Sequence, residues 1–317
     1  MKIVAADIGG TNARFALAEL REGERPALSR VHRYPAADHD GLASAWAAYA
    51  RDLGEKPPKA AAIAVAAPAD QKVLRFVNSE WVIDRAAAAA ELGLERALWL
   101  NDFGAVAHAV SRLEPGELMH ICGPEAALPE QGVATVLGPG TGLGVAMLMR
   151  RGGCRHVIET EGAHIGFAPV GEDEERIERA LRARHGRASV ERVVSGPGLF
   201  DIYRALGGRG FDDDVALWSA ALTGTDPAAA EALDRLVKAF GTAAGDLALA
   251  HGANAVVISS GLSRRIADRL ASSRFRDRFV AKGRYKARLE AIPVRLALHD
   301  EPGLLGAAIA FEREYSR

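Results

Sequence analysis

The stretch Asp7-Ile8-Gly9-Gly10-Thr11-Asn12-Ala13-Arg14 lies between two apolar runs, residues 3–6 and 15–18. An apolar strand, a turn rich in Gly and Thr and a second apolar strand predict a β-hairpin. Glycine permits positive φ and lets backbone N–H groups approach an anion, while Thr and Asn side chains add donors. The stretch therefore indicates a phosphate-binding turn. Its candidate nucleotide-binding residues are Asp7, Gly9, Gly10, Thr11, Asn12 and Arg14, with Arg14 as a fixed cation and Asp7 as a carboxylate able to hold a metal or water.

A second stretch, Gly138-Pro139-Gly140-Thr141-Gly142-Leu143-Gly144, has the same plan between the apolar runs 134–137 and 145–149. Its candidate nucleotide-binding residues are Gly138, Gly140, Thr141 and Gly142. Either stretch alone also fits an ordinary hairpin, because Gly-rich turns between strands are common. Two such turns, each with more donors than a turn needs, favour two phosphate-binding half-sites. Their likeness also suggests an internal duplication as a hypothesis.

The length and composition point to a two-domain protein that binds a small molecule. The chain has 317 residues, enough for two domains, and a net charge of −1, which gives no global field for nucleic acid or an anionic membrane. Two cysteines are too few for a disulfide framework. The apolar start is too short for a signal peptide, and the longest apolar run, residues 60–69, is too short to span a bilayer. We therefore expect a cytoplasmic protein with no nucleic-acid or membrane partner.

The expected elements alternate between strand and helix, which is the pattern of an α/β protein. Besides the hairpins, strands are expected at 31–34, 60–67, 97–100, 256–259 and 294–298, and a polar hairpin near 73–78. Helices are expected at 41–53, 84–92 and 105–113, through most of 172–249, and after Pro302. The proline- and acid-containing segment 114–131 is expected to be a crossing between the lobes.

Polar residues able to recognise a hydroxylated ligand follow these elements. Asn101 and Asp102 come at the carboxyl end of an expected strand, where ligands bind in α/β sheets. Asp102 also fits a helix N-cap, and Glu191 fits the acid-rich first turn of a helix. Glu161 alone fits a solvated loop, and His164 a structural histidine. The spacing of three residues between them favours a functional pair.

Seven motifs, in order along nearly the whole chain, resemble the bacterial glucokinase family. They are DIGGTNARFAL from Asp7, NDF from Asn101, GPGTGLGVA from Gly138, EGAHIGFAP from Glu161, ERVVSGPGL from Glu191, KGRY from Lys282 and HDEPGLLG from His299. The resemblance implies the hexokinase-like, actin-like ATPase superfamily: an α/β fold of two lobes built on RNase H-like sheets that close on sugar and ATP across an interdomain cleft. On this basis we expect a small domain of residues 1–112 and 299–317, and a large domain of residues 113–298.

The resemblance implies a role for each polar candidate. It makes Asp102 the catalytic base that takes the proton of the sugar's 6-hydroxyl, giving glucose 6-phosphate and ADP. Glucose binding falls on Asn101, Asp102, Glu161, His164 and Glu191, and the adenosine-facing turn on Gly261. Relatives carry a Gly-Gly pair where this chain has Ser259 and Ser260, which places a hydroxyl near the adenosine. The resemblance also implies a homodimer.

Magnesium is expected to arrive with ATP and keep most of its waters, with Asp7 meeting it through one of them. No dedicated metal site is expected: Cys154, His156 and His164 lack the paired spacing of tetrahedral zinc, and the Cys-rich zinc motif of the related ROK kinases is absent.

Three other functions remain open. A sugar-sensing regulator on the same scaffold would bind glucose without turnover, and the intact Asp102 argues against it. No helix-turn-helix segment precedes the first strand, so a DNA-binding version has no reading element. An actin-type polymerising ATPase would not need the sugar residues. A kinase for another hexose, or one with another phosphoryl donor, is the closest alternative.

Overall fold

The computed structural model describes residues 1–67, 71–76 and 80–315. Its contacts divide the chain into two compact units, Met1–Leu113 with His299–Arg317, here unit 1, and Glu114–Leu298, here unit 2. Among the described residues, no helix is both long and apolar enough to cross a membrane.

Unit 1 is built on a mixed sheet with the strand order β3-β2-β1-β4-β7. The strands are β1 Lys2–Ile8, β2 Asn12–Glu19, β3 Ala27–Pro35, β4 Ala60–Val65 and β7 Arg96–Asn101. β1, β2 and β3 pair antiparallel, so the Asp7–Arg14 stretch forms the predicted hairpin. β4 and β7 continue from β1 as parallel strands. The carboxyl ends of β1, β4 and β7 therefore meet at one edge, which carries Asp7 and Asn101.

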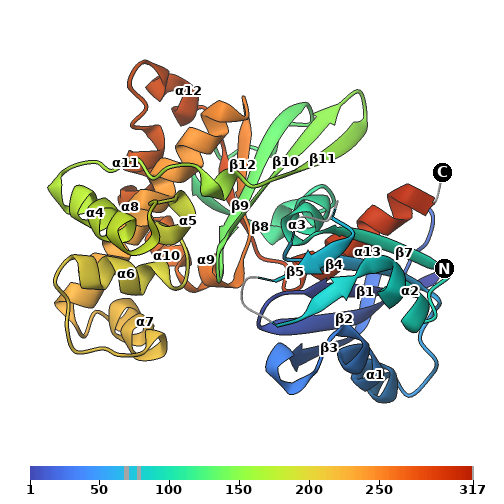
Figure 1. Ribbon diagram of the computed structural model, residues 1–317. Helices are drawn as coiled ribbons and strands as arrows, with labels where there is room; N and C mark the ends of the chain where they lie inside the picture. The colour runs from blue at the N-terminus through green and yellow to red at the C-terminus, as the bar shows by residue number, and fades with distance from the viewer. Residues whose placement is uncertain (68–70, 77–79, 316–317) are drawn as a thin grey trace. The chain divides into compact units, whose positions relative to one another are not determined.

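Helices cover both faces of this sheet (Figure 1). They are α1 Leu42–Leu53, α2 Arg85–Glu91, α3 Asp102–Val110 and α13 Pro302–Tyr315, and unit 1 also holds β5 Val73–Arg75, β6 Val82–Asp84 and the 3-10 turn η1 Ala36–Asp38. One face is packed with aromatic side chains, where Phe15 stacks on Tyr49 of α1 with ring centroids 5.2 Å apart. The other face packs alanines of β1, β2 and β4 against Leu304 and Phe311 of α13. Small side chains on that face allow α13 to lie close to the sheet.

Helices α3 and α13 approach each other closely at one glycine, and Figure 1 draws them side by side. A Cβ on Gly306 would clash with the backbone carbonyl oxygen of Ala105. A Cβ on Gly303 would lie 2.6 Å from the Asp7 carboxylate oxygen Oδ2. The glycines of the Pro302–Gly306 segment thus bring α13 against both the end of β1 and the helix that begins at Asp102.

Unit 2 repeats the strand pattern of unit 1, with the order β11-β10-β9-β12-β13-β8. The strands are β9 Gly132–Pro139, β10 Leu143–Arg151, β11 Cys154–Thr160, β12 Ala255–Ile258, β13 Val294–Ala297 and β8 Leu118–Cys122. β9, β10 and β11 are antiparallel, and β12 and β13 follow in parallel. The two sheets share this topology, as an internal duplication would produce, and β8 is an addition at the edge of the second sheet.

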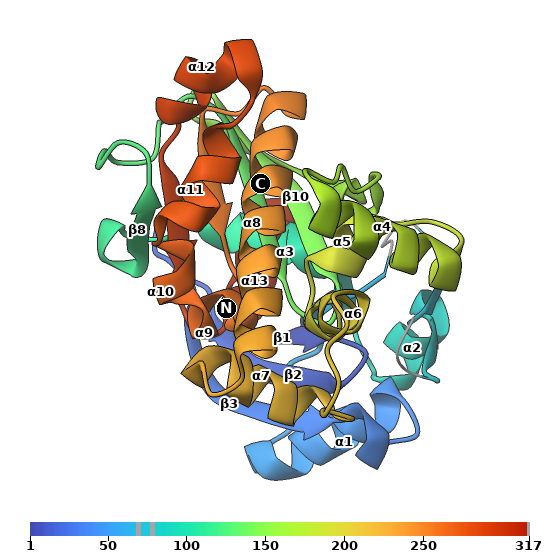
Figure 2. The same cartoon turned by 90° about the vertical axis from the view of Figure 1, so that its left-hand side faces the viewer.

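The helices of unit 2 bury the large core of this unit. They are α4 Glu172–His185, α5 Val190–Val193, α6 Gly198–Ala205, α7 Asp214–Thr223, α8 Pro227–Ala250, α9 Gly261–Arg265, α10 Ala267–Leu270, α11 Ser273–Val280 and α12 Lys286–Glu290, with 3-10 turns η2 Pro115–Glu117, η3 Gly162–His164 and η4 Gly283–Tyr285. Figure 2 shows α11 alongside the long α8. Cβ atoms on Gly241 and Gly245 of α8 would crowd the carbonyl oxygens of Phe275 and Phe279 of α11. Glycine therefore permits the close contact of these two helices.

Most expected elements are confirmed, and four details are corrected. Segment 114–131 is more than a crossing, because its residues Leu118–Cys122 pair with β13. The helix expected at 105 begins at Asp102, since Asn101 caps it. β11 was not expected, and most of its residues are exposed. The hairpin expected near 73–78 extends further, because β5 pairs with β6, Val82–Asp84, and residues 77–78 of the expected range lie outside the described residues.

Candidate functional site

The first turn of unit 1 joins β1 to β2 and is closed by its own backbone. The Gly9 N–H donates to the Asn12 carbonyl at 2.9 Å, and the Thr11 carbonyl accepts from the Ala36 N–H at 2.9 Å. The Asn12 amide donates to the Thr11 hydroxyl at 3.1 Å, and Thr11 is exposed. Within the described part of the chain, the N–H groups of Gly10 and Thr11 have no acceptor. Two backbone donors and a hydroxyl are therefore available to an anion.

The glycines of both turns do not have positive φ. We expected positive φ in these turns, and this was wrong: Gly9, Gly10, Gly138, Gly140 and Gly142 all lie outside the left-handed region. A Cβ built on Gly140 meets nothing within 4 Å, and one on Gly9 only touches the Asn12 carbonyl at 3.6 Å. The fold itself leaves room for a side chain at these two positions. A ligand that approaches the backbone gives a reason for glycine there.

Asp7 and Arg14 face each other across β1 and β2 as register partners. The Arg14 Nη1 lies 3.2 Å from the Asp7 Oδ2, and the two side chains are 32% and 17% exposed. Burial raises the pKa of Asp7 above its usual value, while the Arg14 guanidinium opposes this shift. The pair holds a guanidinium head at the base of the first turn.

Asn101 and Asp102 stand where β7 ends and α3 begins. The Asn101 Oδ1 accepts from the N–H groups of Phe103 and Gly104 at 2.9 and 3.1 Å, so Asn101, and not Asp102, is the N-cap. The Asp102 Oδ1 accepts from the Phe103 N–H at 2.8 Å. The helix N-terminus favours the ionised form of a carboxylate placed there. Asp102 is thus a half-buried, oriented carboxylate at the carboxyl edge of the sheet.

The second turn, in unit 2, is held by the segment Glu191–Leu199. The Gly140 carbonyl accepts from the Gly196 N–H at 2.7 Å, and the Gly140 N–H donates to the Gly142 carbonyl at 2.7 Å. The N–H groups of Thr141 and Gly142 have no acceptor among the described residues. This turn therefore also offers two backbone donors and an exposed threonine hydroxyl.

Glu191 contacts this second turn directly. Its Oε2 accepts from the Leu143 N–H at 3.1 Å. A Cβ on Gly142 would clash with the same oxygen. Gly142 is therefore glycine because the carboxylate occupies the space of its side chain. Ser189 caps α5 through its hydroxyl, which leaves the Glu191 carboxylate for the turn.

Glu161 comes directly before the 3-10 turn η3 and His164 is its last residue, with the Glu161 Oε2 3.7 Å from the His164 Nε2. Both side chains are exposed, at 61% and 58%. The Arg187 guanidinium donates to the His164 carbonyl at 3.0 Å, and the Ile165 carbonyl accepts from the Val190 N–H at 3.0 Å. These bonds attach the Glu161–His164 segment to the residues just before Glu191.

The turn at Ser259, Ser260 and Gly261 uses its hydroxyls within the protein. Ser259 is buried. The Ser260 hydroxyl caps α9 by accepting from the Ser263 N–H at 2.9 Å and contacts the Ser263 hydroxyl at 2.8 Å. A Cβ on Gly261 meets nothing within 4 Å. The expected hydroxyl near the adenosine is thus already engaged as a helix cap.

The predicted residues fall into groups within each unit. Unit 1 brings together the first turn, Arg14 and Asp7, and it carries Asn101 and Asp102 on the same sheet edge. Unit 2 brings Glu191 to the second turn and Glu161 to His164. Sequence reasoning missed Glu301, which lies 3.8 Å from Arg14. Its motif was recognised, but only the packing of α13 places this carboxylate beside β2. No group of three or more His, Cys, Asp or Glu able to hold a metal occurs in the described residues.

Comparisons with known proteins agree over the whole chain. Residues 4–314 match the family model described as Glucokinase. The chain is 49% identical over 321 residues to a glucokinase of Zymomonas mobilis, covering 100% of this chain and 99% of that one. The crystal structure of a glucokinase from an Antarctic psychrotroph superposes with a TM-score of 0.82 at 33% identity, covering 98% of this chain and 99% of that one. A ROK family glucokinase from Streptomyces griseus, in complex with glucose and AMPPNP, has a TM-score of 0.67 at 19% identity, covering 99% and 100%, and supports the fold alone.

Proposed function

The chain belongs to the glucokinase family and phosphorylates glucose with ATP, and from its geometry we propose which residues bind the two substrates and move the proton. The match of family and motifs over nearly the whole chain carries this assignment. The α/β fold with its two related sheets is that of the two-lobed, actin-like ATPases.

Asp102 is the general base. A sugar hydroxyl is a weak nucleophile, and a carboxylate within hydrogen-bond reach orients it and accepts its proton as the phosphoryl group arrives. The backbone N–H of Phe103 at the start of α3 keeps the Asp102 carboxylate oriented. The hydroxyl is the one at position 6, and the products are glucose 6-phosphate and ADP.

The sugar is recognised by Asn101, Asp102, Glu161, His164 and Glu191. Carboxylate, amide and imidazole groups pair with adjacent ring hydroxyls, and a site built on such bonds penalises a sugar that lacks them. Asn101 contributes chiefly by position, because its Oδ1 is engaged as the cap of α3.

The phosphates of ATP bind the backbone donors of the two turns. The donors without an acceptor in the described chain are the N–H groups of Gly10, Thr11, Thr141 and Gly142, with the two threonine hydroxyls beside them. Gly9 and Gly140 permit the close approach, whereas Gly138 is buried within β9, where it pairs with Gly144 of β10. Asn12 orients the Thr11 hydroxyl, and Arg14 adds a cation. Gly261 lies at the turn assigned to the adenosine. The carboxylate of Asp7 suits a Mg²⁺ that comes with ATP and needs few protein ligands. That ion, when bound, neutralises phosphate charge.

A coupled assay of ADP release tests this proposal. With Mg-ATP and a panel of glucose, mannose, fructose and N-acetylglucosamine, we expect turnover with glucose and a loss of about 100-fold or more in Asp102→Asn. Glucose binding by the variant, measured by calorimetry, should persist. Turnover of another hexose in place of glucose would show that the substrate assignment is wrong. Hydrolysis of ATP without sugar would indicate an ATPase. Glucose binding without turnover would indicate a sensor.

We also propose that the protein is a cytoplasmic homodimer, as the family resemblance implies. Sedimentation velocity at micromolar concentration tests whether the protein is a dimer, because a single species of monomer mass would contradict this.

A further inference from the structure

A row of charged side chains crosses three neighbouring strands of unit 1. Asp7 of β1 lies opposite Arg14 of β2, and Arg14 lies opposite Arg33 of β3. Paired residues of adjacent strands project on the same face of a sheet. The two arginines are therefore neighbours. Glu301, the residue just before α13, contacts both of them.

Glu301 bridges the two guanidinium groups. Its Oε2 lies 3.8 Å from the Arg14 Nη1, and its Oε1 lies 3.6 Å from the Arg33 Nη2. Its side chain is 19% exposed, against 32% for Arg14 and 55% for Arg33. Glu301 is thus the most buried of the three, and it touches the arginine that is itself paired with Asp7.

The backbone of Glu301 is fixed independently of its side chain. Its N–H donates to the His299 Nδ1 at 3.1 Å, and its carbonyl accepts from the Leu305 N–H in the first turn of α13 at 3.0 Å. The Oε2 atom is buried and makes no hydrogen bond within the described chain. A buried carboxylate oxygen without a donor is unfavourable, and only the nearby cations offset this cost.

We propose that Glu301 is a positioning residue for Arg14. It acts with Asp7 to hold the guanidinium beside the first turn, where Arg14 meets the phosphates of ATP. The inference rests on the proposed function for the role of Arg14. A free arginine side chain loses rotamer entropy when it binds a ligand. Two carboxylates at one guanidinium remove most of that freedom before ATP arrives.

This role has a kinetic signature that a purely structural role lacks. A carboxylate near the phosphates repels them, so Glu301 opposes the binding of ATP while it improves the orientation of Arg14. In Glu301→Gln, we therefore expect kcat to fall by about tenfold while the KM for ATP stays equal or falls. A residue that only stabilised α13 would lower the melting temperature without this split.

A double-mutant cycle with Arg14→Met tests the proposal. In the Arg14→Met background, the further change Glu301→Gln should alter kcat by less than about twofold, because its target is gone. Glu24→Gln is the matched control, since Glu24 is an exposed acid of the same unit, paired with Arg21 at 3.6 Å. This control should leave kcat and KM unchanged. A loss of kcat that is the same in both backgrounds, no loss at all, or a rise in the KM for ATP without a fall in kcat overturns the proposal.

Titration with ADP separates this inference from the proposed function. If Glu301 orients Arg14, the change that Glu301→Gln causes in the dissociation constant of ADP should differ by about threefold or more between the wild-type and Arg14→Met backgrounds. The direct repulsion of the phosphates by Glu301 is common to both backgrounds, so only the effect that acts through Arg14 makes them differ. A wild-type protein that binds ADP but does not phosphorylate glucose refutes the proposed function, and the ADP cycle still decides the role of Glu301. Equal changes in both backgrounds refute the positioning role alone.

Discussion

The carboxylate of Glu191 accepts a hydrogen bond from the backbone N–H of Leu143 at 3.1 Å. Leu143 is the first residue after the second Gly/Thr turn, and Glu191 is a proposed glucose ligand. The residue proposed to recognise the sugar is therefore attached to the turn proposed to bind phosphate. A displacement of the turn must also displace this carboxylate.

Gly142→Ala should weaken the binding of glucose more than that of ATP. The new methyl group would occupy the space of the Glu191 Oε2 and push the carboxylate away. We expect the KM for glucose to rise by about tenfold or more, because a lost charged hydrogen bond costs about 1.5–3 kcal/mol. Steady-state kinetics with each substrate varied in turn measures the effect.

Gly140→Ala is the matched control in the same turn. A Cβ at Gly140 meets nothing within 4 Å, so Glu191 stays in place and only an approaching phosphate would meet the methyl group. We expect a higher KM for ATP and an unchanged KM for glucose. The same rise for glucose in both variants would show that the Glu191 contact is not responsible.

Gly306→Ala should destabilise unit 1, although alanine is normally the better helix former. The added Cβ would clash with the Ala105 carbonyl oxygen, so α3 and α13 would have to separate. We expect a loss of about 2 kcal/mol or more in the free energy of unfolding, as for overpacked cores. Thermal unfolding with Gly116→Ala as control checks this, because a Cβ on Gly116 meets nothing within 4 Å.

Gly303→Ala, three residues earlier, should affect the binding of ATP more than it affects stability. Its Cβ would lie 2.6 Å from the Asp7 Oδ2, the end of a side chain that can move. We expect a smaller loss of stability than for Gly306→Ala and a higher KM for ATP, since Asp7 holds Arg14. A variant with a lower melting temperature and wild-type kinetics would contradict the role assigned to Asp7.

The sequence predicted the elements whose residues are strongly patterned. The apolar runs around both turns became β1 with β2 and β9 with β10, because such runs are stable only as buried strands. β11 was missed because its residues are polar and mostly exposed, so hydrophobic pattern carries no signal for it. β11 forms because its backbone pairs with the edge of β10 in an antiparallel ladder.

The contacts that position the candidate site were not predictable in the same way. Glu191 and Leu143 are 48 residues apart, and Glu301 reaches Arg14 only because α13 packs on the first sheet. The motifs named both regions without showing that they touch. Likewise, the N-cap of α3 is Asn101 and not Asp102. Both residue types are good N-caps, so the sequence does not show which of the two adjacent residues begins the helix.

His108 should make stability depend on pH below neutrality. Burial, with a smaller contribution from Arg313, lowers the pKa of His108 from 6.5 to about 4, and its Nδ1 is buried without a partner in the described chain. Below pH 6.5 the unfolded chain gains a proton that the folded protein does not, so stability present above that pH is lost as the pH falls towards 4. The loss amounts to about 3 kcal/mol at most.

Urea unfolding of wild type and His108→Gln between pH 4 and 8 measures this loss. The free energy of unfolding should fall less steeply with decreasing pH in the variant. The difference at pH 8 reports packing alone, since the histidine is neutral there in both states. Parallel curves over the whole range would show that His108 does not carry the dependence.

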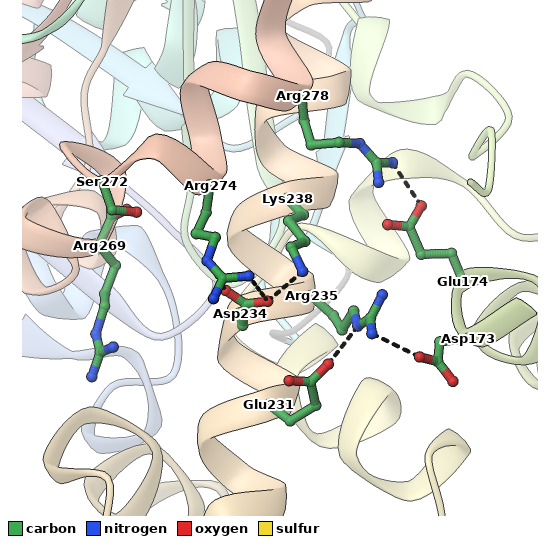
Figure 3. A network of polar contacts seen from close by, with 10 residues as sticks. All are labelled: Asp173, Glu174, Glu231, Asp234, Arg235, Lys238, Arg269, Ser272, Arg274 and Arg278. Atoms are coloured by element: carbon green, nitrogen blue, oxygen red, sulfur yellow. Dashed lines mark hydrogen bonds and ion pairs between the residues drawn. The ribbon is translucent and has the colours of Figure 1, made fainter. Parts of the chain in front are cut away.

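Charged residues connect α4, α8 and α11 in unit 2, as Figure 3 shows. Glu174 of α4 is almost completely buried, with 1% of its side chain exposed, and its Oε2 lies 2.8 Å from the Arg278 Nη2. The same oxygen accepts from the Val170 N–H at 2.8 Å. At the other end of the network, Arg274 is 56% exposed where it pairs with Asp234. The two ion pairs thus differ in burial, and Asp234 also has a second cation, Lys238, whose Nζ lies 2.6 Å from its Oδ2.

Glu174→Gln should cost far more stability than Arg274→Gln. Removal of one partner from a buried ion pair costs about 3–5 kcal/mol because the other charge stays buried, whereas an exposed pair contributes about 0–1 kcal/mol. Arg278 keeps one bond, from its Nε to the Thr242 hydroxyl at 3.0 Å, so the lower end of the first range is expected. Hydrogen exchange of α4 and α8 peptides in increasing urea follows unit 2 alone. Equal losses in the two variants would mean that water reaches Glu174, and that this ion pair behaves as a surface one.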